Sequence, residues 1–186
     1  MRSRVLAAVA AVGMLGVAAT PAQAQINYYT QGWFTSADAS CNGAAPAAGA
    51  PFSSTCTTSS YTLAYSAKAP NPGLIASGSV VSLGSFALTV TGSANLTPGA
   101  VLFTLAIQQT DPTSGTGTLM GSLSGAVMMN NDFSSLMWVP SAQSLTIGST
   151  DYTLIFNDRG PAANRGIAIA VNNAETPTSV QALVST

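Results

Sequence analysis

The sequence predicts an all-β protein built from two stacked sheets, a β-sandwich of jelly-roll-like form. Three observations lead to this fold class. The helix formers Glu, Lys and Arg number only four after residue 24, and Gly or Pro interrupts most windows. Apolar and polar residues alternate with a period of two in most of the segments that remain. No linker is long enough to separate the strands, so residues 25–186 are expected to form a single domain.

Residues 1–24 have the three parts of a secretory signal peptide. Two arginines provide the positive start, residues 5–19 form an apolar stretch, and Ala22-Gln23-Ala24 provides the small-x-small ending that signal peptidase requires. The apolar stretch of about fifteen residues is shorter than the roughly 20 that span a bilayer. We therefore expect cleavage near Ala24, a secreted or periplasmic location and no membrane span in the mature chain.

The first two expected strands flank the only two cysteines. Residues 26–34 are aromatic-rich and extended, and residues 61–65 alternate large and small side chains. Cys41 and Cys56 lie between them, and an oxidising compartment favours a disulfide. Closing a loop of about fifteen residues would stabilise the fold by roughly 3 kcal/mol. The alternatives are a reactive thiol or a metal pair, but the chain has no histidine and no further cysteine to complete a metal site.

Residues 79–91 are expected to form one bent strand. Val81 and Leu83 share one phase of the alternation, whereas Phe86 and Leu88 share the opposite phase, and the change falls at Gly84-Ser85. One extra residue at a glycine is what a β-bulge requires to keep both halves of a strand facing the core.

Residues 101–109 and 117–128 are expected to form an antiparallel pair, because the segment between them is rich in turn formers. In the second strand, Gly121 and Gly125 share the phase of the inward-facing leucines. These glycines would leave room for a bulky neighbour or for the facing sheet.

The last third of the chain contains shorter elements. Residues 133–139 are ambiguous, because Asp132 can cap a helical turn whereas residues 136–139 can form a strand. The remaining expectations are a hairpin of residues 144–147 and 151–157 around Gly148-Ser149-Thr150, a strand over 167–171, an edge strand over 180–184, and surface loops over 44–51 and 68–73.

Four stretches carry a resemblance to a known family: Tyr29-Thr30 with Gly32 and Phe34, residues 78–89, residues 102–125, and residues 144–157. In these strand and turn patterns the chain resembles the bacterial secreted domains named choice-of-anchor, which occur in proteins with varied C-terminal sorting tails. The resemblance implies an exported β-sandwich of unassigned function and carries no catalytic residues. Residues 172–186 contain neither a hydrophobic helix nor a basic tail, so we expect a protein that is released or held in the periplasm.

Charge is scarce and hydroxyl groups are abundant. Charged residues make up 6% of the chain, against roughly 25% in ordinary globular proteins. Serine and threonine make up 42 of the 162 residues from residue 25 onward, where three cations and six acids give a net charge of −3. So few cations disfavour nucleic acids and anionic membranes as partners. The absence of histidine excludes Ser-His-Asp and Cys-His catalysis, and zinc or haem held by histidine.

Two kinds of binding site are compatible with the remaining residues. Tyr29 and Trp33 share one face of their strand, with Gln31 between them, and exposed rings in this arrangement can stack on sugars. Core filling is the alternative fate of these rings. The oxygen donors of residues 130–132 and of Asn157-Asp158 are compatible with a structural calcium ion, although turn formation explains them better, because the pattern lacks the acid density of known calcium loops. No other cofactor and no other metal are expected.

A carboxylate-based hydrolase is the one hydrolytic mechanism left, with Asp158 and Glu175 or Asp111 and Asp132 as the pair. Turn formers adjoin most of these acids, so Asx turns account for them without catalysis. We therefore expect a non-catalytic exported protein, a cell-surface, matrix or adhesion component whose partner is an extracellular glycan or a surface protein. The alternative is a carbohydrate-binding module, and edge-to-edge self-association is left open.

Overall fold

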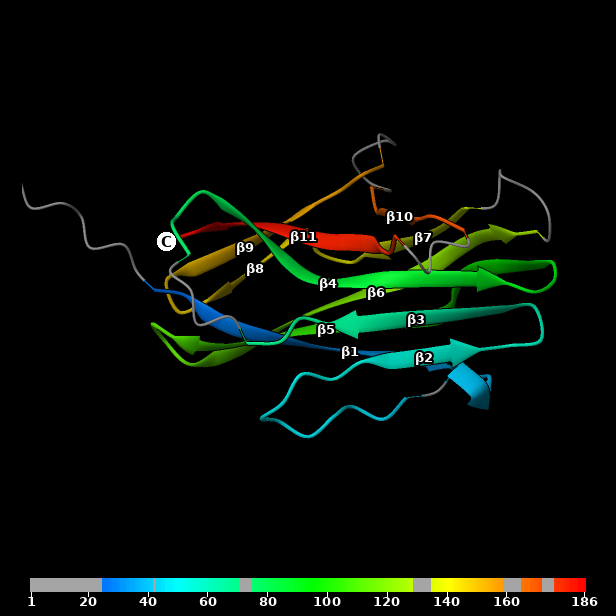
Figure 1. Cartoon of the computed structure of the whole chain (residues 1–186), viewed down its shortest axis with the longest axis horizontal. Coiled ribbons are helices and arrows are strands. Elements are labelled where there is room, and N and C mark those ends of the chain that lie inside the picture. Colours follow the sequence, from blue (N-terminus) through cyan, green and yellow to red (C-terminus); the bar gives the residue numbers. More distant parts are fainter. Residues whose placement is uncertain (1–24, 42, 71–74, 129–134, 159–164, 172–175) are drawn as a thin grey trace, which may run out of the picture.

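The computed structural model describes residues 25–186 except residues 42, 71–74, 129–134, 159–164 and 172–175, so the predicted signal peptide lies outside the described residues. Two antiparallel sheets pack against each other, which confirms the predicted all-β sandwich (Figure 1). Within the described ranges, the one helical element is the short 3₁₀ turn η1 (Ala39–Cys41). No helix in this part of the chain is long and apolar enough to cross a membrane.

In the described segments the two sheets contain eleven strands. The five-stranded sheet has the order β1 (Asn27–Ser36), β5 (Ala94–Asp111), β6 (Gly115–Val127), β7 (Ser135–Pro140) and β10 (Ile167–Ile169). The six-stranded sheet has the order β2 (Ser54–Thr57), β3 (Tyr61–Ala67), β4 (Ser79–Val90), β11 (Thr178–Ser185), β9 (Thr150–Ile155) and β8 (Ser144–Ile147).

An aromatic cluster joins the two sheets. Phe103 of β5 lies at its centre, with its ring 4.8 Å from that of Phe86 on β4 and 4.9 Å from that of Tyr65 on β3. Phe34 and Trp138 extend the cluster, with rings 5.0 and 5.4 Å from that of Phe103. All five side chains are at most 1% exposed. Because each ring buries a large apolar area, the cluster supplies much of the attraction between the sheets.

The predicted bulge is confirmed in β4. Val180 of β11 lies opposite Gly84, whereas Gln181 lies opposite Ser82, so Leu83 is the extra residue. Gly84 has a φ of +120°, and a Cβ atom there would lie 2.6 Å from the carbonyl oxygen of Ser66. Glycine is therefore required at this position both for the backbone conformation and for the close approach of β3.

The predicted antiparallel pair is also confirmed as β5 and β6, although β5 begins at Ala94, well before the expected start. Gly121 of β6 leaves the predicted room for a bulky neighbour, which is Trp138. A Cβ atom at Gly121 would lie 2.5 Å from the indole nitrogen of Trp138. That nitrogen donates a hydrogen bond of 3.3 Å to the carbonyl oxygen of Phe103. The glycine therefore allows a tryptophan to complete the cluster.

Two expectations are corrected. Residues 178–185 form β11 in the interior of the six-stranded sheet, between β4 and β9, and not at its edge. The hairpin of β8 and β9 has a two-residue connection, because Thr150 already pairs with Ile147 and Gly148 adopts the positive φ of +62°. The sequence also gave no indication of β2, a strand of only four residues.

The ambiguous segment before Pro140 is a strand, β7, and Asp132 lies outside the described residues. The predicted strands around residues 61–65 and 167–171 are present as β3 and the shorter β10. The predicted loop over residues 44–51 contains no strand, and the same is true of residues 68–70, the described part of the second predicted loop.

Side chains and loops cover part of the two outer edges of the five-stranded sheet. On β1, the Thr30 N–H donates to the Lys68 carbonyl oxygen at 3.0 Å, and Phe52 makes two further backbone hydrogen bonds to the same edge. On β10, the Asn157 amide accepts from the Ala168 N–H at 2.7 Å and donates to the Ala168 carbonyl oxygen at 2.9 Å. Because free strand edges template strand addition, these contacts oppose edge-to-edge association at both positions.

The close approach at Gly121 leads to a stability prediction. A Gly121→Ala substitution places a methyl group against the Trp138 indole and the β7 backbone, so we expect a loss of about 1–3 kcal/mol in the free energy of unfolding. Urea denaturation followed by tryptophan fluorescence measures this loss. Ser124→Ala, a half-buried position in the same strand, is the control and should change stability by less than about 0.5 kcal/mol. Equal unfolding midpoints for the two variants would contradict the packing described here.

Candidate functional site

The outer face of β1 contains the two aromatic residues predicted to form a sugar platform. Tyr29, Gln31 and Trp33 alternate with Tyr28, Thr30 and Phe34, which face the other sheet. Tyr29 and Gln31 contact a neighbouring loop and are only 8% and 3% exposed, whereas Trp33 is half-buried. The two rings therefore share a face as expected, but only Trp33 retains a substantial exposed surface.

The loop over residues 43–52 is what buries Tyr29 and Gln31. The Gln31 amide donates to the carbonyl oxygens of Ala47 and Ala50 at 2.9 and 2.8 Å. The Tyr29 hydroxyl accepts a hydrogen bond of 2.9 Å from the N–H of Gly49. These bonds hold the loop across the outer face of β1.

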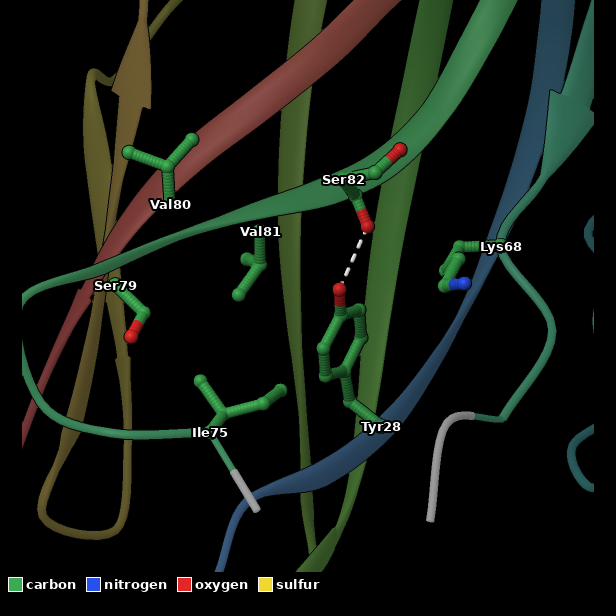
Figure 2. A pocket seen from close by; sticks show the side chains of 7 residues that line it. All are labelled: Tyr28, Lys68, Ile75, Ser79, Val80, Val81 and Ser82. Carbon is green, nitrogen blue, oxygen red and sulfur yellow. Dashed lines mark hydrogen bonds between the residues drawn. The ribbon is translucent and has the colours of Figure 1, made fainter. Parts of the chain in front are cut away.

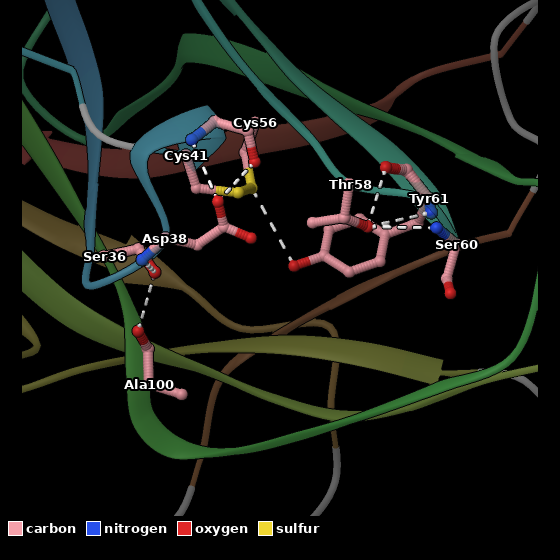
Figure 3. The surroundings of a disulfide bond; sticks show 9 residues. Ser36, Asp38, Cys41, Cys56, Thr58, Ser60, Tyr61 and Ala100 are labelled. Carbon is pink, nitrogen blue, oxygen red and sulfur yellow. Dashed lines mark hydrogen bonds between the residues drawn. A yellow bond between two sulfur atoms is a disulfide. The ribbon is translucent and has the colours of Figure 1, made fainter.

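The predicted disulfide closes this loop. Cys41 and Cys56 are bonded to each other, their Cα atoms are 4.1 Å apart, and both are at most 1% exposed (Figure 3). The Tyr61 hydroxyl lies 3.8 Å from the Cys56 sulfur and shields it from one side. The disulfide thus fixes both ends of the segment that covers β1.

Asp38 lies just before the disulfide in the chain. Its carboxyl group accepts hydrogen bonds from the backbone and side chain of Ser40, and these bonds lower its pKa.

The outer face continues from β1 across β5, β6 and β7 with almost no charge. The five strands of this sheet contain a single charged residue, Asp111, at the very end of β5. Trp33 lies opposite Thr104 of β5, and Thr104 lies opposite Met120 of β6, which is 49% exposed. Hydroxyl groups and apolar side chains therefore alternate across this face.

A shallow depression of about 380 Å³ lies on the same face, beyond Met120. Its lining consists of Pro98, Ser122, Ser124, Met137 and Val139. Such a surface can offer hydroxyl hydrogen bonds and apolar contacts to a ligand, and it offers no charge. We define the uncharged face as Trp33, Thr104, Met120 and these five lining residues.

Of the acidic residues considered for hydrolysis or calcium binding, the structure describes Asp111 and Asp158. Asp111 is at the end of β5, and Asp151 on β9 of the other sheet accepts a hydrogen bond from Thr146. Asp158 follows β9, whereas Asp132 and Glu175, like Asn130 and Asn131, lie outside the described residues. Among the residues that are described, no group of three acidic, cysteine or histidine side chains is placed to hold a metal ion.

A second surface, not anticipated from the sequence, lies where β1 approaches β4. The Tyr28 hydroxyl donates a hydrogen bond of 2.6 Å to the Ser82 carbonyl oxygen and so connects the two sheets (Figure 2). Beside this contact is a cavity of about 310 Å³, lined by Lys68 together with Ile75, Val81 and Ser79. The alternation of β1 indicates that Tyr28 faces inward, but no sequence pattern predicts that a lysine lies beside it.

Buried tyrosines connect the sheets at two further points, Tyr65 to Thr30 and Tyr152 to Gln109. The Tyr65 hydroxyl bonds the Leu83 carbonyl oxygen and the Thr30 hydroxyl, and the Tyr152 hydroxyl bonds the Gln109 side chain at 2.8 Å. Burial disfavours the charged phenolate, which raises the pKa of Tyr28 to about 12 and raises the pKa of Tyr65 and Tyr152 further.

The disulfide leads to a second prediction. In a double variant with Cys41→Ser and Cys56→Ser the loop is no longer closed, so we expect the free energy of unfolding to fall by about 3 kcal/mol. The loop over Tyr29 should also become sensitive to protease. Urea denaturation and limited proteolysis measure the two effects, with Ser59→Ala outside the loop as a control. An unchanged unfolding midpoint in the double variant would show that loop closure does not stabilise the fold.

The buried tyrosines lead to a third prediction, the loss of stability in alkali. Because the pKa of Tyr28 is about 12 in the folded chain and about 10 in the unfolded chain, the stabilisation is complete below pH 10 and is lost as the pH rises toward 12. Tyr28 alone should contribute a slope of about −1.4 kcal/mol per pH unit in this window. Urea denaturation between pH 8 and 12 measures the slope, which Tyr28→Phe should make less steep. A slope unchanged in Tyr28→Phe would contradict this assignment.

Two surfaces are therefore candidates for function: the uncharged face of the five-stranded sheet, and the cavity beside Tyr28 and Lys68. The first can bind neutral groups, and the second presents a cation. Comparisons of the chain with models of protein families, with curated proteins and with solved structures found no match.

Proposed function

We propose that this protein is a non-catalytic component of the cell exterior, in a surface, matrix or adhesive layer, and that it contacts its partner through the uncharged face. The observation that carries the proposal is this face itself. It extends over four adjacent strands, and it combines the half-buried Trp33 with the exposed Met120 and with the hydroxyls of Ser122 and Ser124, whereas Thr104 is only 8% exposed. Exposed apolar side chains among neutral polar ones are typical of contact surfaces.

The disulfide supports a location outside the cytoplasm. Cys41 and Cys56 are paired, and oxidising compartments favour such bridges. The basic and apolar pattern of residues 1–24 and the resemblance to secreted choice-of-anchor domains agree with export. The scarcity of charge supports the same proposal, because the contact must then use hydrogen bonds and apolar packing in place of ion pairs.

A neutral glycan is the partner that Trp33 favours, which makes a carbohydrate-binding module the second candidate. Trp33 lies opposite Thr104, and on the same face Gln108 accepts a hydrogen bond from the Thr116 hydroxyl. A half-exposed indole can stack on the apolar face of a sugar ring, while neighbouring hydroxyl and amide groups bond the sugar hydroxyls. Burial of Tyr29 limits the platform to one ring, so we expect weak binding to single sugars and stronger binding to polymers that cross the face.

The test is binding of the purified protein to a glycan array and to insoluble polysaccharides. For any glycan bound, Trp33→Ala should weaken the affinity by about tenfold, because an anchoring aromatic side chain commonly contributes more than 1 kcal/mol. Leu183→Ala, an exposed apolar position on the other sheet, is the control and should leave the affinity unchanged.

Three outcomes would count against the proposal. Turnover of any glycan or ester by the protein would overturn its non-catalytic part. Equal effects of Trp33→Ala and Leu183→Ala would exclude the uncharged face as the glycan site. If no glycan binds, cross-linking to proteins of the cell surface should still map to Met120 and its neighbours, and cross-links located elsewhere would overturn the choice of face.

A further inference from the structure

The cavity beside Tyr28 has the composition of a site for an organic anion. It measures about 310 Å³, which is within the size range of small-molecule sites. Figure 2 shows Lys68 at one end and Ser79 at the other, with the Tyr28 ring, Ile75 and Val81 between them. The lining therefore places a cation and a hydroxyl group on either side of an apolar middle.

Lys68 is held in place by its backbone. Its N–H donates to the Thr30 hydroxyl at 2.8 Å, and its carbonyl oxygen accepts from the Thr30 N–H at 3.0 Å. Thr30 is fully buried in β1 and also bonds the Tyr65 hydroxyl. The backbone of Lys68 is therefore fixed at the junction of the two sheets. Its side chain extends from this fixed point to the cavity.

Within the described part of the chain, the Lys68 ammonium group has no carboxylate partner. The lysine is half-buried, and no acidic residue lines the cavity. A bound anion would give the ammonium group the counter-charge that the lining of the cavity lacks. Lys68 is the only lysine in the sequence. Its place at the cavity is therefore not one of many lysines spread over a basic surface.

We propose that this cavity binds a hydroxylated carboxylate of the size of a uronic acid. The carboxylate pairs with Lys68, a hydroxyl group of the ligand bonds Ser79, and the carbon skeleton packs on Ile75 and Val81. A carboxylate suits a lysine because it accepts charge-assisted hydrogen bonds. A free sulfate ion would satisfy the lysine but not the apolar middle of the cavity. This proposal does not depend on the uncharged face, which lies on the outer side of the five-stranded sheet.

The single lysine makes the test specific. Protein labelled with ¹³C at the lysine Cε gives one lysine signal by NMR, and this signal reports on Lys68 alone. Titration with glucuronate should shift the signal saturably, with a dissociation constant of about 1 mM or lower, as expected for a small ligand in an open site. Glucose, the neutral counterpart, and sodium chloride at matched ionic strength should not produce a saturable shift.

Two pairs of substitutions, followed by isothermal calorimetry, complete the test. Lys68→Gln should weaken glucuronate binding at least tenfold, whereas Arg165→Gln, which removes the same charge elsewhere, should not. Ser79→Ala should weaken binding about fivefold, as for a lost hydrogen bond, whereas Ser77→Ala should have no effect. Circular dichroism of each variant verifies that the fold is retained.

Several results would overturn the inference. A shift of equal size with chloride would mean that the lysine responds only to ionic strength. Equal affinities for acetate and glucuronate would show that the sugar skeleton makes no contact. Equal losses in Lys68→Gln and Arg165→Gln would locate the anion elsewhere. Loss of glucuronate binding in Trp33→Ala, with Lys68→Gln unaffected, would assign the acidic sugar to the uncharged face instead.

Discussion

The contact of Phe103 with Phe86 and Tyr65 is the interaction on which the rest of this structure depends. Phe103 belongs to one sheet and Phe86 and Tyr65 to the other, and the Phe103 ring lies within 5 Å of each of the other two in the fully buried centre of the sandwich. With so few charges in the chain, apolar packing and hydrogen bonds must hold the layers together. The tyrosine hydroxyls act at the borders of this packing, where Tyr28 bonds the Ser82 carbonyl group of β4 and Tyr65 bonds the Thr30 hydroxyl of β1 across the interface.

Both candidate surfaces follow from this packing. Because the phase of β1 directs Tyr28, Thr30 and Phe34 toward the core, it directs Trp33 outward. The same inward tyrosine forms one wall of the cavity at Lys68, and the same inward threonine fixes the lysine backbone. A register error of one residue in β1 would therefore alter both surfaces together with the core.

The sequence was sufficient for the features that depend on local pattern. The change of phase at Gly84 predicted the bulge, and the two glycines of β6 predicted space for a large neighbour. It was not sufficient for features that depend on distant partners. The alternation in residues 180–184 does not reveal whether a strand has one neighbour or two, so β11 was expected at an edge. Likewise, a segment of Gly, Ala and Pro gives no sign that its carbonyl groups will bond Gln31 and cover Tyr29.

The hydrogen bonds of Asn157 to Ala168 have a consequence for the ageing of the protein. A side-chain amide can both accept from an N–H group and donate to a carbonyl group, and β10 uses both functions. Deamidation to aspartate would keep the acceptor but would set a second oxygen against the Ala168 carbonyl oxygen. The Ala168 carbonyl oxygen would lose its donor, so a single hydrolysed amide would weaken the cover of β10 and favour the addition of a further strand at this border.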